Sequence, residues 1–138
     1  MRGGLFAVLV LFALPVQAHE LRPAYLKIAE LSGGLEQVNY EVLWRLPVGA
    51  EIPLRLEPVL PENCRTSDAP DVTSTGLMRS AKLIMQCRGG LAGETIRIAG
   101  LESALTDVLV RIERADGTTQ VERLTPASTS LEVTTRSS

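Results

Sequence analysis

The only histidine of the chain, His19, follows a short apolar segment, and this position determines what chemistry the N-terminus can support. A basic residue precedes an unbroken apolar run over residues 5–14, and the small residues Val16 and Ala18 occupy the −3 and −1 positions of a signal-peptidase site. The run covers about ten residues, whereas a membrane-spanning helix needs about twenty. We therefore expect residues 1–18 to be a secretory signal peptide that is cleaved between Ala18 and His19.

Cleavage at this site would free the α-amino group of His19 beside its imidazole ring. The amino nitrogen and Nδ1 together can chelate one Cu²⁺ or Ni²⁺ ion, because imidazole is a suitable ligand for both metals. The chain holds no second histidine, so Glu20 or another carboxylate would have to complete the coordination. The alternative interpretation is that His19 is a mobile polar terminus without a ligand.

The metal hypothesis predicts that only the cleaved chain binds, because the chelate needs a free α-amino group. We expect the chain beginning at His19 to bind Cu²⁺ weakly, in preference to Ni²⁺, with an affinity that falls as the pH approaches the ordinary imidazole pKa of about 6.5. Calorimetric titration should compare this chain with a version carrying one extra N-terminal residue and with His19→Ala. Equal binding by all three chains, or none by the cleaved chain, would remove the hypothesis.

Two cysteines, Cys64 and Cys87, remain in a chain that is expected to fold in an oxidising compartment. An even number of cysteines in a secreted chain is typical of disulfide bonding, so we predict a Cys64–Cys87 bridge. Closing this loop should stabilise the fold by roughly 3 kcal/mol in the chain-entropy description. A redox-active or metal-binding thiol pair is the alternative, but such pairs usually lie closer in sequence and have further ligands nearby.

Short runs of alternating apolar and polar residues, separated by Gly, Pro, Asn and Asp, make up most of the chain after residue 19. This period of two is typical of half-buried strands, and helical patterning is nearly absent. We predict an all-β fold, an antiparallel immunoglobulin-like β-sandwich held by one disulfide. The strand faces expected in its core carry Val38, Tyr40, Val42, Trp44, Leu46, Ile52, Leu54, Leu56, Leu83, Met85, Ile96 and Ile98.

The clearest local signal is a hairpin that turns at Asp116 and Gly117, two residues that tolerate the positive φ of a type I′ turn. A two-residue turn at this position brings apolar residues opposite each other and opposite charges together. The predicted cross-strand pairs are Ile112–Val121 and Arg111–Glu122.

The expected organisation is a signal peptide over residues 1–18, one β-sandwich domain over residues 19–127, and a C-terminal edge strand with a flexible tail over residues 128–138. Residues 64–80 are polar and rich in turn formers, which predicts a long loop or a frayed hairpin. The formal net charge is −2 without a basic run, so a nucleic-acid partner is not expected. No later apolar segment reaches spanning length, so we expect no membrane insertion of the mature chain.

Two groups of side chains are candidates for partner recognition. The first is Trp44 with Arg45, although a tryptophan among alternating apolar residues more often packs in the core beside a disulfide, as in immunoglobulin domains. We favour the core interpretation. The second group is scattered over predicted strand faces, where charges are usually only solvated, and consists of Arg22, Tyr25, Arg97 and Arg111.

Several ordered blocks of the sequence resemble one family of membrane proteins. The blocks are AHELRPAYLKI, YEVLWRLP, LPENC, GGLAGETIRIAGL after the second cysteine, TDVLVRIERADG and LTP. They are similar to the extracytoplasmic N-terminal region of HupE/UreJ proteins, which are polytopic and associated with nickel supply to hydrogenase and urease. The resemblance covers nearly the whole mature chain. The family's transmembrane helices, which carry its proposed metal-permeation residues, have no counterpart in this sequence, so no transport residue is carried over.

This resemblance implies a fold and a compartment more directly than an activity. The sequence contains no nucleophile–histidine motif, no metal-ligand cluster and no phosphate-binding loop, so we do not expect an enzyme. The leading hypothesis is a periplasmic or secreted accessory and interaction module that acts alongside a polytopic membrane protein. The alternative is a soluble periplasmic copper or nickel binder that uses His19, and no other cofactor is expected.

Overall fold

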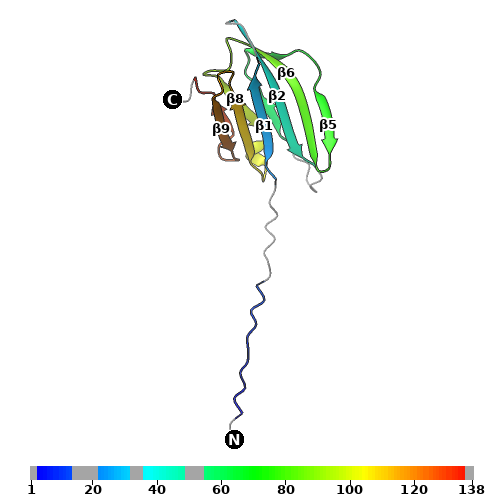
Figure 1. Ribbon diagram of the computed structural model, residues 1–138, viewed down its shortest axis with the longest axis vertical. Coiled ribbons are helices and arrows are strands. Elements are labelled where there is room, and N and C mark those ends of the chain that lie inside the picture. The colour runs from blue at the N-terminus through cyan, green and yellow to red at the C-terminus, as the bar shows by residue number, and fades with distance from the viewer. Residues whose placement is uncertain (1–2, 14–21, 32–35, 49–54, 136–138) are drawn as a thin grey trace.

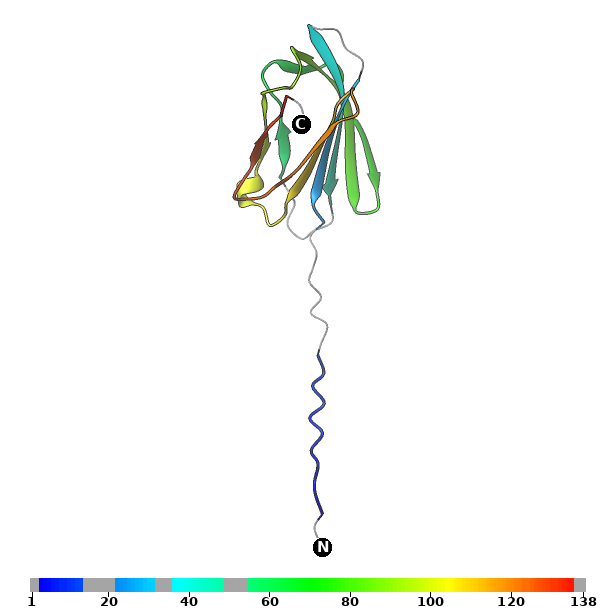
Figure 2. The ribbon, with the colours of Figure 1, turned by 60° about the vertical axis from the view of Figure 1, so that its left-hand side comes forward.

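The computed structural model describes residues 3–13, 22–31, 36–48 and 55–135. Within these residues, two β-sheets form the two layers of a sandwich (Figure 1, Figure 2). The large sheet has the strand order β4-β6-β2-β1-β8-β9, with β5 also pairing with β6, and the small sheet has the order β10-β7-β3. The all-β sandwich that the alternating pattern predicts is therefore confirmed.

The elements are short and joined by turns, as the sequence pattern indicates. Their bounds are β1 Ala24–Glu30, β2 Gln37–Pro47, β3 Glu57–Val59, β4 Cys64–Thr66, β5 Asp71–Thr75, β6 Met78–Arg88, β7 Thr95–Ala99, the 3₁₀ helix η1 Leu101–Ser103, β8 Val108–Glu113, β9 Thr119–Leu124 and β10 Ser130–Glu132. The predicted C-terminal edge strand is present as β10, which pairs with β7 at one edge of the small sheet. Residues 64–80 contain a β5–β6 hairpin, so the hairpin alternative for this segment is confirmed.

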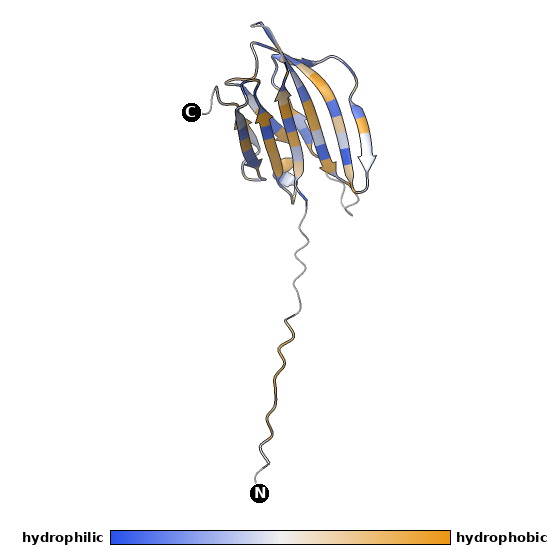
Figure 3. Ribbon diagram, in the orientation of Figure 1, coloured by the Kyte–Doolittle hydropathy of each residue, from blue (hydrophilic) through white to orange (hydrophobic). Residues whose placement is uncertain are grey.

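The core lies between the sheets because alternate residues of each strand point inward. In β1, for example, Ala24, Leu26 and Ile28 are fully buried, whereas Tyr25 and Lys27 between them are only half-buried. Figure 3 shows the resulting bands of hydrophobic and hydrophilic residues along the strands. The predicted core residues among those described are all buried or packed against the core: Val38, Tyr40, Val42, Trp44, Leu46, Leu56, Leu83, Met85, Ile96 and Ile98. Ile52 and Leu54 lie outside the described residues.

One strand pairing departs from the antiparallel arrangement that we predict. Strands β1 and β8 run parallel, from Ala24 opposite Val108 to Ala29 opposite Glu113, so the large sheet is mixed. A parallel pair needs a crossover connection, and the chain supplies it by passing through β7 in the small sheet before it returns as β8. Alternation has the same period in both kinds of pairing, which is why the sequence pattern does not separate them.

The β8–β9 hairpin forms, but its predicted register is wrong by one residue. Ile112 lies opposite Gln120, and Arg111 lies opposite Val121 instead of Glu122. Because side chains alternate along a strand, this shift turns every residue of β9 to the other face. Val121, which we expect in an apolar cross-strand pair, is instead 51% exposed.

The error in register comes from the turn, which is one residue longer than predicted. The Gly117 N–H donates to the Arg114 carbonyl at 3.0 Å, and the Arg114 N–H donates to the Thr118 carbonyl at 2.9 Å. Gly117 has φ +87°, whereas Asp116 keeps a negative φ and accepts the Thr118 N–H at Oδ1. This is a three-residue turn with a left-handed glycine at its end, and not a type I′ turn.

The predicted disulfide is present, with the Sγ atoms of Cys64 and Cys87 2.05 Å apart. The two cysteines are cross-strand partners on β4 and β6, so the bridge joins neighbouring strands of the large sheet. In immunoglobulin domains the corresponding bridge connects the two sheets. The resemblance to that class therefore covers the two-layer sandwich but not the placement of its disulfide.

Candidate functional site

The large sheet has one face that packs on the small sheet and one face that does not. We call the second the outer face; in Figure 1 and Figure 2 no described strand or helix covers it. The residues that alternate with the core positions point to this face, including Tyr25 and Lys27 of β1 and Leu109 and Arg111 of β8. An uncovered sheet face is normally polar, so its apolar residues need an explanation.

Five apolar side chains run across the outer face, one on each strand from β6 to β9. Tyr25 lies directly opposite Leu109, and Leu43 is a diagonal neighbour of both Tyr25 and Ile84. Val121 is diagonal to Leu109 and completes the row, which we call the outer stripe. Such neighbours lie about 5–8 Å apart, within reach of large side chains. Ile84 and Val121 are 37% and 51% exposed, which marks the outer stripe as a candidate contact surface.

Ion pairs flank the outer stripe on both sides. They are Lys27–Glu113 at 3.7 Å, Lys82–Glu41 at 3.8 Å, Arg111–Glu113 at 2.9 Å and Arg123–Asp107 at 3.5 Å. The Arg111 guanidinium donates a hydrogen bond to Glu113 and, with a smaller contribution from Lys27, holds the pKa of that carboxyl below its ordinary value. Because these side chains are all at least one-third exposed, the pairs add little to the stability of the fold.

Removing the stronger partner of Glu113 should change its titration more than removing the weaker one. We expect Arg111→Gln to raise the pKa of Glu113 toward its ordinary value, and Lys27→Gln to raise it less. In the unaltered protein the ionised carboxylate favours the folded state above the unfolded-state pKa, and this contribution is lost as the pH falls through the lower folded-state pKa. Carbon-detected NMR titration of the carboxyl group measures the midpoint. Identical midpoints in the three proteins would contradict this account of the ion pairs.

A groove of about 550 Å³ lies on the outer face where β2, β6 and β5 adjoin. Arg45 and Lys82 line it together with the hydroxyl groups of Ser80 and Thr73, and Asp71 provides its one carboxylate. Ser80 lies opposite Arg45 on one side and opposite Thr73 on the other, so these three side chains form a row across the groove. Lys82 has an ion-pair partner, whereas Arg45 has none within the described part of the chain.

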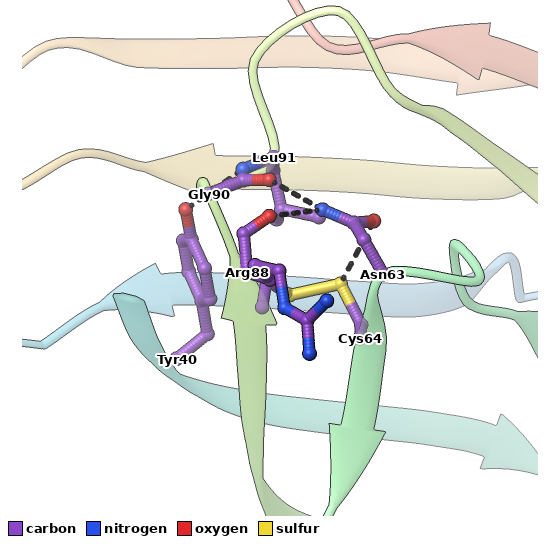
Figure 4. The surroundings of a disulfide bond; sticks show 7 residues. Tyr40, Asn63, Cys64, Arg88, Gly90 and Leu91 are labelled. Atoms are coloured by element: carbon purple, nitrogen blue, oxygen red, sulfur yellow. Dashed lines mark hydrogen bonds between the residues drawn. A yellow bond between two sulfur atoms is a disulfide. The ribbon is translucent and has the colours of Figure 1, made fainter. Parts of the chain in front are cut away.

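A second groove, of about 230 Å³, lies at the other end of β6 beside the disulfide. Arg65 and Arg88 line it with Gln86 and Glu62. Neither arginine forms an ion pair with any residue in the ranges that the structure describes. Figure 4 shows the Arg88 side chain next to the bridge, at the point where β6 ends.

Hydrogen bonds that involve the side chains of Asn63 and Tyr40 hold the backbone where β6 ends, next to this second groove (Figure 4). Asn63 Nδ2 donates to the carbonyl oxygens of Arg88 at 2.8 Å and Gly90 at 2.9 Å, and the Leu91 N–H donates to Tyr40 Oη at 3.1 Å. Gly90 has φ +80°, and a Cβ there would lie 3.3 Å from Tyr40 Oη. Burial raises the pKa of Tyr40, so its hydroxyl stays protonated and structural. The Asn63 hydrogen bond to the Arg88 carbonyl holds the backbone of Arg88 at the end of β6.

The residues of the metal hypothesis lie outside the described part of the chain. His19, Glu20 and the cleavage site after Ala18 all fall in residues 14–21, so their roles stay predictions. Among the described residues, no group of three or more His, Cys, Asp and Glu side chains is placed to hold a metal ion.

The side chains of Trp44 and Arg45 point to opposite faces of the large sheet, as those of adjacent residues on a strand must. Trp44 is half-buried and packs against the core, which agrees with the favoured interpretation. It lies six positions along β2 from Val38, the residue opposite Cys87, so it is not beside the disulfide. Arg45 points to the outer face, where it lines the larger groove.

The four scattered residues proposed as a surface patch do not come together. Tyr25 and Arg111 share the outer face, on the neighbouring strands β1 and β8. Arg97 belongs to β7 in the small sheet, and Arg22 precedes β1, where its carbonyl accepts the Thr106 hydroxyl. Only the first two therefore remain part of a candidate surface.

The outer stripe is not among the features predicted from the sequence, although a signal for it exists. Strands with one wet face alternate strictly, whereas strands that are apolar on both faces show unbroken apolar runs. Such runs occur at four of the five stripe residues, in Ala24-Tyr25-Leu26, Val42-Leu43-Trp44, Leu83-Ile84-Met85 and Val108-Leu109-Val110. No such signal marks Val121, whose outward position follows from the turn.

No protein-family model matches the sequence, and no characterised protein matches it as a relative. Within the residues that the structure describes, no helix has the length and apolar character needed to cross a membrane.

Proposed function

We propose that this chain is a non-enzymatic interaction module that acts outside the cytoplasm, beside a polytopic membrane protein of the HupE/UreJ kind. The outer stripe carries the proposal, because it is an apolar row across five strands that no described element covers. Ion pairs border it on both sides. An apolar centre with a polar rim is the usual composition of a protein–protein contact surface.

Two features support the extracytoplasmic location. A disulfide between cysteines that are neighbours across two strands persists in an oxidising compartment and is rare in the cytosol. The apolar N-terminal segment lies apart from the sandwich (Figure 1), with Leu5 97% and Phe6 94% exposed. A segment that contributes nothing to the core can be removed without loss of the fold, as cleavage after Ala18 requires.

The test is co-purification of the cleaved protein from detergent-solubilised membranes of cells that produce it. We expect a polytopic membrane protein to be retained, and Val121→Glu to lower its recovery by about tenfold or more. The added carboxylate is costly to bury, because Arg111 opposite it already pairs with Glu113. The matched control is Val59→Glu, at an exposed valine of the small sheet. Unchanged recovery with Val121→Glu, or an equal loss with Val59→Glu, would contradict the proposal.

A further inference from the structure

The two grooves of the outer face lie along one strand, β6. Ser80 lines the larger groove and Arg88 lines the smaller one, so about 25 Å of extended chain separates them at roughly 3.3 Å per residue. Both grooves are open to solvent on the outer face. Ile84, 37% exposed and on the same face, lies between them. The strand thus presents two polar recesses with an apolar residue at the centre.

The grooves also hold the outer-face arginines that lack partners. Lys27, Lys82, Arg111 and Arg123 each have a carboxylate within ion-pair distance. Arg45 in the larger groove, and Arg65 and Arg88 in the smaller one, have none in the described ranges. A guanidinium presents several N–H donors in a planar fork that matches a carboxylate. Unpaired arginines at both ends of β6 therefore favour a ligand with carboxylates at both ends.

The remaining lining groups favour a peptide over a small anion. Ser80, Thr73 and Gln86 offer hydroxyl and amide groups that can donate to and accept from a peptide backbone. Each groove also contains one carboxylate, Asp71 or Glu62, which weakens attraction for an anion of arbitrary shape. A ligand gains binding free energy only when its carboxylates are spaced so that they reach the arginines.

We propose that the two grooves bind an extended acidic segment of a partner protein that lies along β6. Its terminal acidic side chains pair with Arg45 at one end and with Arg65 and Arg88 at the other, and an apolar side chain packs on Ile84. This inference rests on the proposed function, because it takes the partner to be a protein that meets the outer face. It adds the chemistry by which that partner is recognised.

The test uses a terminally blocked peptide of about ten residues, the length that spans both grooves, with two glutamates at each end and valine at its centre. Amide NMR shifts of the chain beginning at His19 report its binding. We expect shifts concentrated on β2, β4 and β6. The Kd should rise about fivefold in Arg45→Gln and, separately, about fivefold in Arg88→Gln, which corresponds to the free energy of one exposed ion pair. Arg97→Gln, on the small sheet, is the matched control and should leave the Kd unchanged.

Three results would overturn the inference. The first is equal binding of a peptide in which glutamine replaces every glutamate, and the second is an equal loss with Arg97→Gln. The third is a single-stranded oligonucleotide of the same length that binds more tightly than the peptide. Peptide binding without recovery of a membrane protein would contradict the proposed function alone, whereas recovery of the membrane protein without peptide binding would contradict this inference alone.

Discussion

Reduction of the Cys64–Cys87 bridge should lower the free energy of unfolding by roughly 3 kcal/mol, since the bridge closes a loop with a sequence separation of 23. Strand β4 has three residues and, among the described strands, pairs with β6 alone, so the bridge and the hydrogen bonds of the adjacent Asn63 are its main attachments. Urea unfolding of the protein with and without reductant measures the difference.

The control for this prediction is the double variant Cys64→Ala and Cys87→Ala. Its stability should be lower than that of the oxidised protein and should not respond to reductant. Thiol labelling of the oxidised, denatured chain should find no reactive cysteine. A decrease of less than about 1 kcal/mol in the free energy of unfolding on reduction would show that the bridge does not stabilise the fold by restricting the unfolded chain.

Replacing Gly100 by alanine should destabilise the fold by about 3 kcal/mol or more, because two costs combine at this position. Gly100 has φ +88°, and a Cβ built on it would clash with the Arg55 carbonyl oxygen, which belongs to the backbone and cannot rotate away. The residue links β7 to η1, whose Leu101 is fully buried, so the strain falls on the core.

Gly117→Ala is the matched control for the Gly100 variant. Gly117 has nearly the same φ, +87°, but no atom lies within 4 Å of the added Cβ. Only the conformational cost of the left-handed backbone remains, about 1–2 kcal/mol. Urea unfolding should therefore give Gly100→Ala a clearly lower free energy of unfolding than Gly117→Ala. Equal decreases in the two variants would show that the contact with Arg55 relaxes without cost.

Alternation was sufficient to predict the core, because burial of one strand face repeats with a period of two regardless of how the strands pair. It placed Met85, Ile96 and Ile98 correctly for this reason. The disulfide followed from compartment and cysteine number, since only one pairing of Cys64 and Cys87 exists. These features depend on composition and on local pattern, both of which a single sequence contains.

The features that the sequence did not predict depend on long-range geometry. The parallel pairing of β1 and β8 depends on the path of the chain through the small sheet. The β9 register depends on whether Asp116 adopts a positive φ, and a hydrogen bond from Thr118 to its side chain accompanies the longer turn. The grooves with Arg45 and Arg88 form only when β4, β5 and β2 all pair with β6, which no local pattern indicates.

The most direct test of the outer face as the contact surface is site-specific photo-cross-linking in membranes of producing cells. A photoreactive residue should replace Leu43 or Leu109 of the outer stripe, and Val59 of the small sheet in the control. The account predicts adducts with a polytopic membrane protein from the two outer-stripe positions and none from position 59. Adducts from position 59 alone, or equal adducts from all three positions, would contradict it.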